Sequence, residues 1–319
     1  PQRGPASAAA HGGGLMPRLR RPPPIDGVGA SRIQLPAGSW GSLVEALCSL
    51  FPGVDEATWR QRFARGRVLD GQGSPVSPES ACRNGDEVHY YREVGHEPEP
   101  VEPEAVLHRD ADLVVADKPH GMPVVPAGGV VRQTLLARLA RRLGCDDLVP
   151  LHRIDRDTAG LVLFSCNPAS RGMYQRLFPE RRIRKAYEAV APALPGLALP
   201  HARHSRIVRG EPFFRMREVP GEANCMTRIS LIHAEGAAWL YALAPREGRK
   251  HQLRVHMAAL GAPILGDRVY GDEQGDADAG LPLQLLARAL AFDDPLRGGM
   301  REFRSARSLA GAPTGGAPL

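Results

Sequence analysis

Residues 152–160, with the sequence HRIDRDTAG, form the densest run of chemically active side chains in the chain. Two aspartates, two arginines and a histidine precede an apolar segment, so the run is predicted to be a loop that leads into a strand. Such groups can supply a nucleophile or a general base, but they would equally suit a solvated connecting loop. A protein-kinase catalytic loop is excluded, because it needs an uninterrupted His-Arg-Asp and Ile154 separates the arginine from the aspartate here.

Two further segments carry polar groups among apolar ones. In residues 246–257, REGRKHQLRVHM, basic and amide side chains alternate with Leu, Val and Met on an expected helix. His251 and His256 are five residues apart and do not share a helix face, and no HExxH pair occurs, so a metal site is not expected. Tyr187 lies in residues 184–190, RKAYEAV, where it is expected to be a half-buried strand residue.

These segments belong to residues 105–306, which are predicted to form one α+β domain. Strands are expected at 105–108, 113–116, 160–164, 186–190, 228–233, 238–242 and 289–292, and helices over 134–143, 169–178 and 250–260. The chain contains neither GxGxxG nor GxxxxGKS/T, so dinucleotide and P-loop chemistry are not expected.

A smaller domain is predicted at residues 31–93, with helices over 40–51 and 55–64 and strands at 68–69 and 88–91. Its second helix and the residues just after it carry four arginines, which suit a solvated face or a nucleic-acid backbone: Arg60, Arg62, Arg65 and Arg67. Residues 94–104, VGHEPEPVEPE, are expected to be a stiff acidic linker. Residues 1–30 and 307–319 are rich in Ala, Gly and Pro and are expected to be disordered tails.

The composition argues against a membrane-spanning protein and against a disulfide-rich or zinc-ribbon protein. The 319 residues suit about two domains, and no apolar run reaches the roughly 18 residues of a membrane span. Five cysteines without a CxxC pair argue against a disulfide framework or a zinc ribbon and fit a reducing cytoplasm. The formal net charge is +6, and only three of the 41 basic residues are lysine. Arginine suits phosphate and base edges, although a GC-rich genome would produce the same excess.

Taken in order, the three segments resemble the RluA-type RNA pseudouridine synthases. The family motifs His-Arg-Leu-Asp-x-x-Thr-Ser-Gly, Lys-x-Tyr and Gly-Arg-x-His-Gln-Leu-Arg-Val-His are met by residues 152–160, by Lys185 and Tyr187, and by residues 248–256. Residues 117–122, DKPHGM, and 266–271, GDRVYG, are also typical, so the resemblance covers about residues 105–305. One departure is Leu285-Leu286-Ala287, where many members carry Leu-His-Ala, which marks a different subfamily.

The resemblance implies a fold and a set of site residues. The larger domain would have a mixed, mainly antiparallel central sheet flanked by helices, and residues 31–93 more weakly resemble an α/β RNA-binding domain like that of ribosomal protein S-four. Asp155 would be the catalytic carboxylate, Arg254 its charged partner, and Tyr187 the ring that stacks on uracil and a candidate base for carbon 5. The residues expected to bind RNA are His152, Arg153, Lys185, Arg249, Lys250, His251, Gln252, Arg60, Arg62 and Arg65.

The expected activity is therefore the isomerisation of uridine to pseudouridine in structured RNA, without a metal or cofactor, in the cytoplasm. Ribosomal RNA is favoured because of the N-terminal module, and transfer RNA stays open. A non-catalytic RNA-binding or RNA-chaperone protein would not require Asp155, Tyr187 and Arg254 together. A metal-dependent nuclease is not favoured, because the sequence has no clustered Asp and Glu set.

Overall fold

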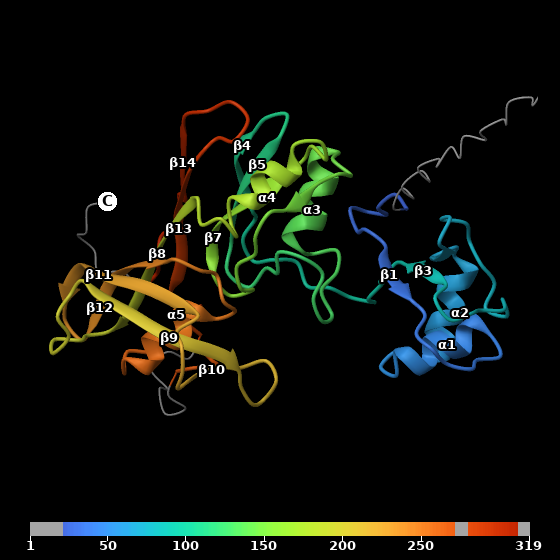
Figure 1. Ribbon diagram of the computed structural model, residues 1–319, viewed down its shortest axis with the longest axis horizontal. Helices are drawn as coiled ribbons and strands as arrows, with labels where there is room; N and C mark the ends of the chain where they lie inside the picture. The colour runs from blue at the N-terminus through green and yellow to red at the C-terminus, as the bar shows by residue number, and fades with distance from the viewer. Residues whose placement is uncertain (1–21, 272–279, 312–319) are drawn as a thin grey trace, which may run out of the picture. The chain divides into compact units, whose positions relative to one another are not determined.

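The computed structural model describes residues 22–271 and 280–311 and divides the chain into two compact units (Figure 1). One unit consists of residues up to Ile25 together with Gly29–Arg92, and the other of Asp26–Val28 together with residues from Glu93 onward. The chain thus changes unit at Arg92, next to the start of the acidic segment.

The first unit is a three-stranded antiparallel sheet with two helices. Its elements are β1 (Ser31–Gln34), α1 (Leu43–Leu50), α2 (Glu56–Ala64), β2 (Val68–Asp70) and β3 (Glu87–Tyr90), with strand order β1-β3-β2. Ser42 and Asp55 cap the two helices by accepting hydrogen bonds from backbone N–H groups in their first turns. Trp59 is fully buried against Phe51 and Tyr90 and anchors the small core.

The second unit is built on an 11-stranded mixed sheet. Its strands are β4 (Ala105–Arg109), β5 (Leu113–Lys118), β6 (Val149–Pro150), β7 (Ala159–Ser165), β8 (Ile183–Pro192), β9 (His201–Arg209), β10 (Met216–Val219), β11 (Cys225–Glu235), β12 (Ala238–Pro245), β13 (Leu285–Asp293) and β14 (Met300–Arg304). The order is β10-β9-β11-β12-β8-β13-β7-β5-β4, with β14 beside β13 and β6 beside β7. The β13–β7 pair is parallel, and the other pairs between described strands are antiparallel, so the predicted fold class is confirmed.

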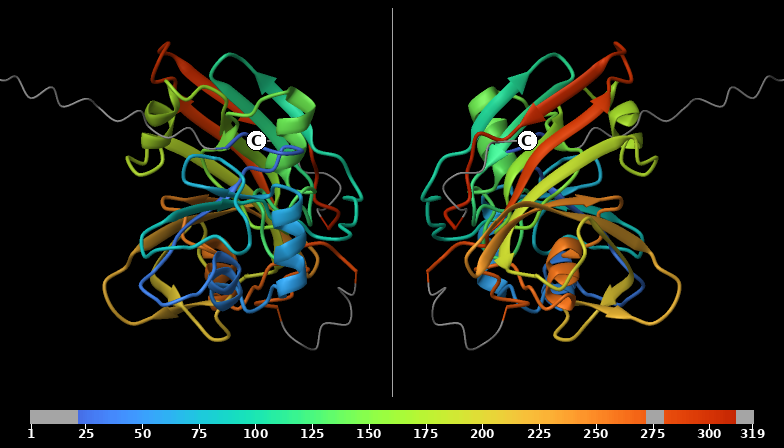
Figure 2. Two further views of the ribbon diagram at one scale, coloured as in Figure 1. Left: turned by 90° about the vertical axis from the view of Figure 1, so that its right-hand side faces the viewer. Right: turned by 90° about the vertical axis from the view of Figure 1, so that its left-hand side faces the viewer.

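Among the described residues, three helices cover this sheet: α3 (Leu135–Leu143), α4 (Arg171–Arg176) and α5 (Gln252–Ala259). Leu135 and Leu139 of α3 pack on the β5–β7 part of the sheet, whereas Leu253 and Met257 of α5 pack on β8, β11 and β12. The views in Figure 2 show α5, in orange, against the yellow strands, apart from the green and red strands. The α3 side and the α5 side of the unit therefore have separate apolar cores, and strands β8 and β13 lie between them.

The ends of the described chain differ from the predicted tails. Val28 is buried against Val131 and Ala137, and Gly27 approaches the carbonyl of Ala137 so closely that a Cβ atom would lie 2.3 Å from it. At the other end, Leu309 is buried and the N–H of Gly311 donates to Gln284. Residues 22–30 and 307–311 are therefore packed, while the remaining parts of both predicted tails lie outside the described residues.

The acidic segment 94–104 was expected to be a stiff linker, but two of its carboxylates are bonded to the larger unit. The buried carboxylate of Glu97 accepts hydrogen bonds from the backbone N–H groups of residues 131–133, at 2.8–3.0 Å. Burial alone would raise the pKa of Glu97, but these three donors outweigh it and lower the pKa. Glu104 is buried and pairs with Arg138 at 2.7 Å, so the segment is bound to the larger unit at two carboxylates.

Candidate active site

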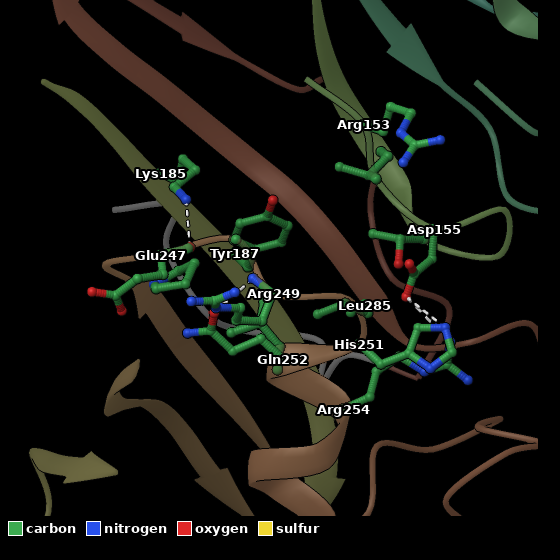
Figure 3. Close-up of a pocket in the computed structure, with 15 residues that line it drawn as sticks. Arg153, Asp155, Lys185, Tyr187, Glu247, Arg249, His251, Gln252, Arg254 and Leu285 are labelled. Atoms are coloured by element: carbon green, nitrogen blue, oxygen red, sulfur yellow. Dashed lines mark hydrogen bonds and ion pairs between the residues drawn. The ribbon is translucent and has the colours of Figure 1, made fainter. Parts of the chain in front are cut away.

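The three chemically active segments meet in one pocket of the second unit, with a volume of about 470 Å³ (Figure 3). Asp155 comes from the loop that precedes β7, Tyr187 from β8, Arg254 from the first turn of α5, and Leu285 from the start of β13. The parallel β13–β7 pair brings Gly160 beside Ala287, where an added Cβ would meet the carbonyl oxygen of Ala287 at 2.3 Å. Glycine at this position therefore allows β7 and the loop that carries Asp155 to approach the centre of the sheet.

Arg254 is buried and joins two carboxylates. Its Nε and Nη2 atoms donate to Asp267 at 2.7 and 2.6 Å, and its Nη1 donates to Oδ2 of Asp155 at 3.2 Å. Burial alone would lower the pKa of Arg254, but the bonds to Asp267 and the charge of both carboxylates outweigh burial and raise it. Burial alone would likewise raise the pKa of Asp267, whereas Arg254 and two backbone N–H donors lower it. Both groups are therefore charged at neutral pH.

Asp155 is the more accessible of the two carboxylates, with 28% of its side chain exposed to the pocket. Its Oδ2 atom lies 3.2 Å from Arg254 and 3.9 Å from Nε2 of His251, whereas no described residue donates to its Oδ1 atom. One oxygen is thus fixed by the protein and the other faces the space where a substrate would lie. A fixed, charged and partly exposed carboxylate can act as a nucleophile or as a general base.

Tyr187 forms a wall of the same pocket from the middle of the sheet. It is half-buried, and its hydroxyl forms no hydrogen bond with another described residue. Burial and the charge of Asp155 raise its pKa, so the ring is a neutral phenol before substrate binds. A neutral aromatic ring beside a carboxylate offers a flat apolar face to a planar group.

The loop that follows β12 forms the rim of the pocket and is held by hydrogen bonds to β8 and β11. Lys185 donates to the carbonyl of Glu247 at 2.6 Å, and the Glu247 carboxylate accepts from the N–H of Met226 and pairs with Arg181. Gln252 accepts from the N–H of Arg249 and donates to the backbone of Met226. Arg249 and Lys250 consequently project from a fixed loop and are exposed.

Gln252 and His152 were predicted to bind RNA, and the structure gives them other partners. Gln252 is buried, with both ends of its amide bonded to protein groups, because it holds the rim loop onto β11. His152 accepts from the N–H of Leu163 at 3.0 Å and stacks on Phe178, and burial, with the charge of Lys185, lowers its pKa to about 3. Both side chains are thus held by partners within the protein, and their contacts with RNA stay predictions.

The basic residues predicted in the first unit also separate into different environments. Arg62 is buried, with its guanidinium 4.7 Å from the centre of the Trp59 ring, because the two residues are three apart on α2. Arg60 is exposed but pairs with Glu56 and Glu79, each at 2.7 Å. Arg65 is exposed at the end of the helix. Little of the Arg62 side chain is accessible in this conformation, and its contact with RNA stays a prediction.

Three residues of the site were not among those predicted from the sequence. Asp267 and Tyr270 belong to the segment GDRVYG, which is a visible signal, but only the structure shows that they contact Arg254 and His251. Lys118 is fully buried and donates to the carbonyls of Pro119 and Arg156, so it joins the end of β5 to the loop that carries Asp155. Burial lowers the pKa of Lys118 to about 7 against the opposing charges of Asp157 and Asp155.

The described part of the chain has neither a cluster of three metal-ligating side chains nor a helix that could cross a membrane. Among residues 22–271 and 280–311, no three His, Cys, Asp or Glu side chains come together as a metal site would require. No helix in the same residues is both long and apolar enough to cross a membrane.

Comparisons with known proteins agree with this geometry. Residues 112–259 match the family described as RNA pseudouridylate synthase. An uncharacterized RNA pseudouridine synthase of Synechocystis is 35% identical over 224 residues, which cover 68% of this chain and 75% of that protein. A dual-specificity RNA pseudouridine synthase of Pasteurella multocida is 32% identical over 207 residues, which cover 60% of this chain and 87% of that protein.

Among solved structures, human RNA pseudouridylate synthase domain containing 1 aligns with a TM-score of 0.55 and 26% identity, over 66% of this chain and 86% of that one. The matched residues include the loop that carries Asp155, β8 and the first turn of α5, which all line the pocket. The resemblance seen in the sequence is confirmed: the chain belongs to the RNA pseudouridylate synthase family and is an RNA pseudouridine synthase, an isomerase that acts on RNA.

Proposed function

We propose that this enzyme converts uridines of ribosomal RNA to pseudouridines and that Asp155 is its catalytic carboxylate. The observation that carries this assignment is the pairing of Asp155 with Arg254, at 3.2 Å, in the pocket that Tyr187 also lines. Glu247 is the other carboxylate at this pocket, but it is bonded to Met226 and Arg181. Asp155 is therefore the carboxylate with an oxygen available to a substrate.

The reaction transfers C1′ of the ribose from N1 of uracil to C5, so one bond to carbon breaks and another forms without oxidation or reduction. Asp155 either attacks C1′ as a nucleophile and is later released, or removes a ribose proton and later returns it. In both routes the uracil leaves as an anion, turns in the pocket and bonds through C5. The C5 proton is then lost and N1 gains a proton, so the product is an isomer of the substrate.

Tyr187 would serve the two halves of this reaction in different ways. Its ring supports the uracil while the glycosidic bond breaks, and its hydroxyl is the candidate acceptor of the C5 proton. Burial and the charge of Asp155 both raise the pKa of Tyr187 in the free enzyme. In either route Asp155 is uncharged while it is esterified or protonated, and it regains its charge when C5 bonds to C1′, before the C5 proton leaves.

The surface around the pocket has the character expected of an RNA-binding groove. A larger depression of about 1890 Å³ opens beside the pocket, with exposed arginines and Lys250 on its rim and an apolar wall at residues 123–125. Next to it, the β9–β10 hairpin exposes the adjacent rings of Phe213 and Phe214, and Lys250 donates to the carbonyl of Phe214. Cationic groups would hold the RNA backbone, and the apolar surfaces suit unstacked bases.

A uridine must leave its stack to reach Asp155, at a cost of a few kcal/mol. Arg153 is exposed in the loop that carries Asp155. We assign it the role of filling the gap that the flipped base leaves in the RNA. Ribosomal RNA is favoured over transfer RNA because the separate first unit resembles an RNA-binding module of a ribosomal protein. Action in the cytoplasm stays a prediction from the cysteine content.

The test is a pseudouridine assay on unmodified ribosomal and transfer RNA, with Asp155→Asn as the catalytic variant. Release of tritium from C5-labelled uridine reports turnover, and mapping of the product locates the uridine. We expect the wild type to act on ribosomal RNA, and Asp155→Asn to bind the same RNA within a few-fold yet form no product. Turnover on transfer RNA alone would contradict the proposed substrate.

Asp157→Asn provides the matched control, because it makes the same charge change two residues away at an exposed side chain. This variant should keep a rate near that of the wild type, since Asp157 makes no contact with Arg254. Product formation by Asp155→Asn, or equal loss in both variants, would refute the assignment of the catalytic carboxylate.

A further inference from the structure

His251 stands between the catalytic carboxylate and Tyr270. It precedes the first residue of α5 with a left-handed backbone, φ +56°, and its side chain makes no capping bond. Its Nε2 atom lies 3.9 Å from Oδ2 of Asp155, and its Nδ1 atom lies 2.7 Å from the hydroxyl of Tyr270. Only about 10% of the side chain is exposed. The sequence predicted an RNA contact here, whereas the ring is packed beneath the catalytic carboxylate (Figure 3).

The hydrogen bonds around Tyr270 determine which nitrogen of His251 carries the proton. The hydroxyl of Tyr270 already accepts from the backbone N–H of Met216 at 2.8 Å, and it has a single proton to donate. Donation of that proton to Nδ1 satisfies both rings and leaves the imidazole proton on Nε2, facing Asp155. The opposite tautomer would direct the Nε2 lone pair at a carboxylate and leave the tyrosine proton without a described acceptor.

The charge of the ring follows from its surroundings. Burial is the largest influence and lowers the pKa of His251, and Arg254 and Lys250 lower it further. Asp155 and Asp267 act in the opposite direction without reversing the shift. The imidazole is therefore neutral at pH 7 and acts as an uncharged N–H donor.

We propose that His251 is a positioning residue for Asp155: its neutral imidazole, oriented by Tyr270, shares Oδ2 of Asp155 with Arg254 and leaves Oδ1 directed at the ribose. Two donors on one oxygen stop rotation of the carboxylate about its Cβ–Cγ bond. The separation of 3.9 Å in the free enzyme closes to a hydrogen bond when RNA covers the pocket. This assignment rests on the proposed role of Asp155 as the catalytic carboxylate.

The test compares two variants that keep different atoms of the histidine. In His251→Asn the amide replaces the Nδ1 side of the ring, so the contact with Tyr270 is kept and the donor to Asp155 is lost. Asparagine also tolerates the left-handed backbone of this position. In His251→Gln the longer side chain returns an uncharged N–H near the position of Nε2. Single-turnover rates at saturating RNA, RNA affinities and melting temperatures are measured for both.

We expect His251→Asn to lower the single-turnover rate by roughly 10- to 100-fold, as for the loss of a hydrogen bond to a charged group, and to change RNA affinity by less than threefold. His251→Gln should recover at least a third of the difference in log rate constant between the wild type and His251→Asn. If His251→Asn instead weakens RNA binding and keeps the rate at saturation, His251 is an RNA contact and the proposal is overturned. Equal losses in both variants, in step with their melting temperatures, would show a merely structural role and also overturn it.

A nuclear magnetic resonance measurement tests the tautomer without relying on activity. Imidazole ¹⁵N signals at pH 7.5 should include one neutral ring protonated at Nε2 that disappears in His251→Asn. Tyr270→Phe, which keeps the ring under Arg254 and removes the hydroxyl, should shift this signal towards the other tautomer and lower the rate. A charged ring, or a ring protonated at Nδ1, would refute the assignment. Wild-type enzyme without any activity would instead contradict the proposed function, so the two failures are distinguishable.

Discussion

Asp267→Asn tests the idea that a second, non-catalytic carboxylate fixes Arg254. In the wild type the Asp267 side chain is buried, accepts two bonds from Arg254 and also accepts from the N–H groups of Val269 and Tyr270. Removing one partner of a buried ion pair costs about 3–5 kcal/mol. We place this variant near ~3 kcal/mol, because the amide keeps one acceptor and Asp155 still compensates Arg254 in part. For a unit of this size, that loss lowers the melting temperature by about 6–12 °C.

The pH dependence gives the same prediction an internal check. The folded-state pKa of Asp267 lies below the unfolded value of about 3.9, so its contribution to stability is fully present above that pH. This contribution is lost as the pH falls through the folded pKa. The difference in melting temperature between wild type and Asp267→Asn should therefore stay constant from pH 7 to pH 5 and narrow below about pH 4. Asp157→Asn, at an exposed position, provides the control for the loss of one negative charge.

Turnover of Asp267→Asn, measured well below its melting temperature, should fall by roughly 10- to 100-fold, because small displacements of a catalytic group have effects of that size. Melting is followed by circular dichroism and turnover by tritium release. An unchanged melting temperature at pH 7, or a difference that persists undiminished at pH 3, would refute the view that the Arg254–Asp267 pair stabilises the site.

Two further predictions address the uracil site and the first unit. Tyr187→Phe should bind RNA and cleave the glycosidic bond but accumulate a species that has not lost the C5 proton; tritium release at the wild-type rate would leave stacking as the only role of Tyr187. Arg62→Ala should lower the melting temperature of the first unit by exposing Trp59, with little effect on the salt dependence of RNA affinity. Arg65→Ala should leave stability near that of the wild type and reduce the slope of log affinity against log salt by roughly 0.7–0.9 for one phosphate contact; equal slopes would mean that this arginine does not touch the RNA.

The sequence predicted most of the elements that build the site, since their periodicity is strong. The apolar runs before residue 165 and around residue 190 became β7 and β8, and Asp55 and Thr134 cap the helices that follow them. Strands β9 and β10 were missed because HARHSRIVR and MREV lack regular apolar alternation: both lie at one edge of the sheet with many exposed side chains. The start of α5 was expected two residues early, since a left-handed residue such as His251 leaves no signal in the hydrophobic pattern.

The sequence predicted the site residues that line the pocket themselves. It did not predict the residues that only hold another site residue in place. Asp155, Tyr187 and Arg254 do share one pocket, as expected from three separate motifs. The roles of Asp267 and Tyr270 depend on contacts between a helix and a distant turn, which no local pattern encodes. Burial is also a tertiary property: Arg62 and Gln252 have the residue types of RNA contacts, yet only 6% of Arg62 and 4% of Gln252 is exposed.

The two carboxylates around Arg254 have different environments that fit different tasks. Asp267 is buried and takes two of the guanidinium donors and two backbone N–H groups, so nearly all of its acceptor capacity is used. Among the described residues, Arg254 donates its remaining Nη1 group to Asp155 and His251 approaches it, and both contacts fall on one oxygen. A carboxylate with every lone pair bonded is well oriented but a poor nucleophile, whereas one bonded at a single oxygen is oriented and still reactive. Asp267 thus takes two donors of Arg254 and orients it, whereas Asp155 takes one donor and keeps an oxygen available for the proposed reaction.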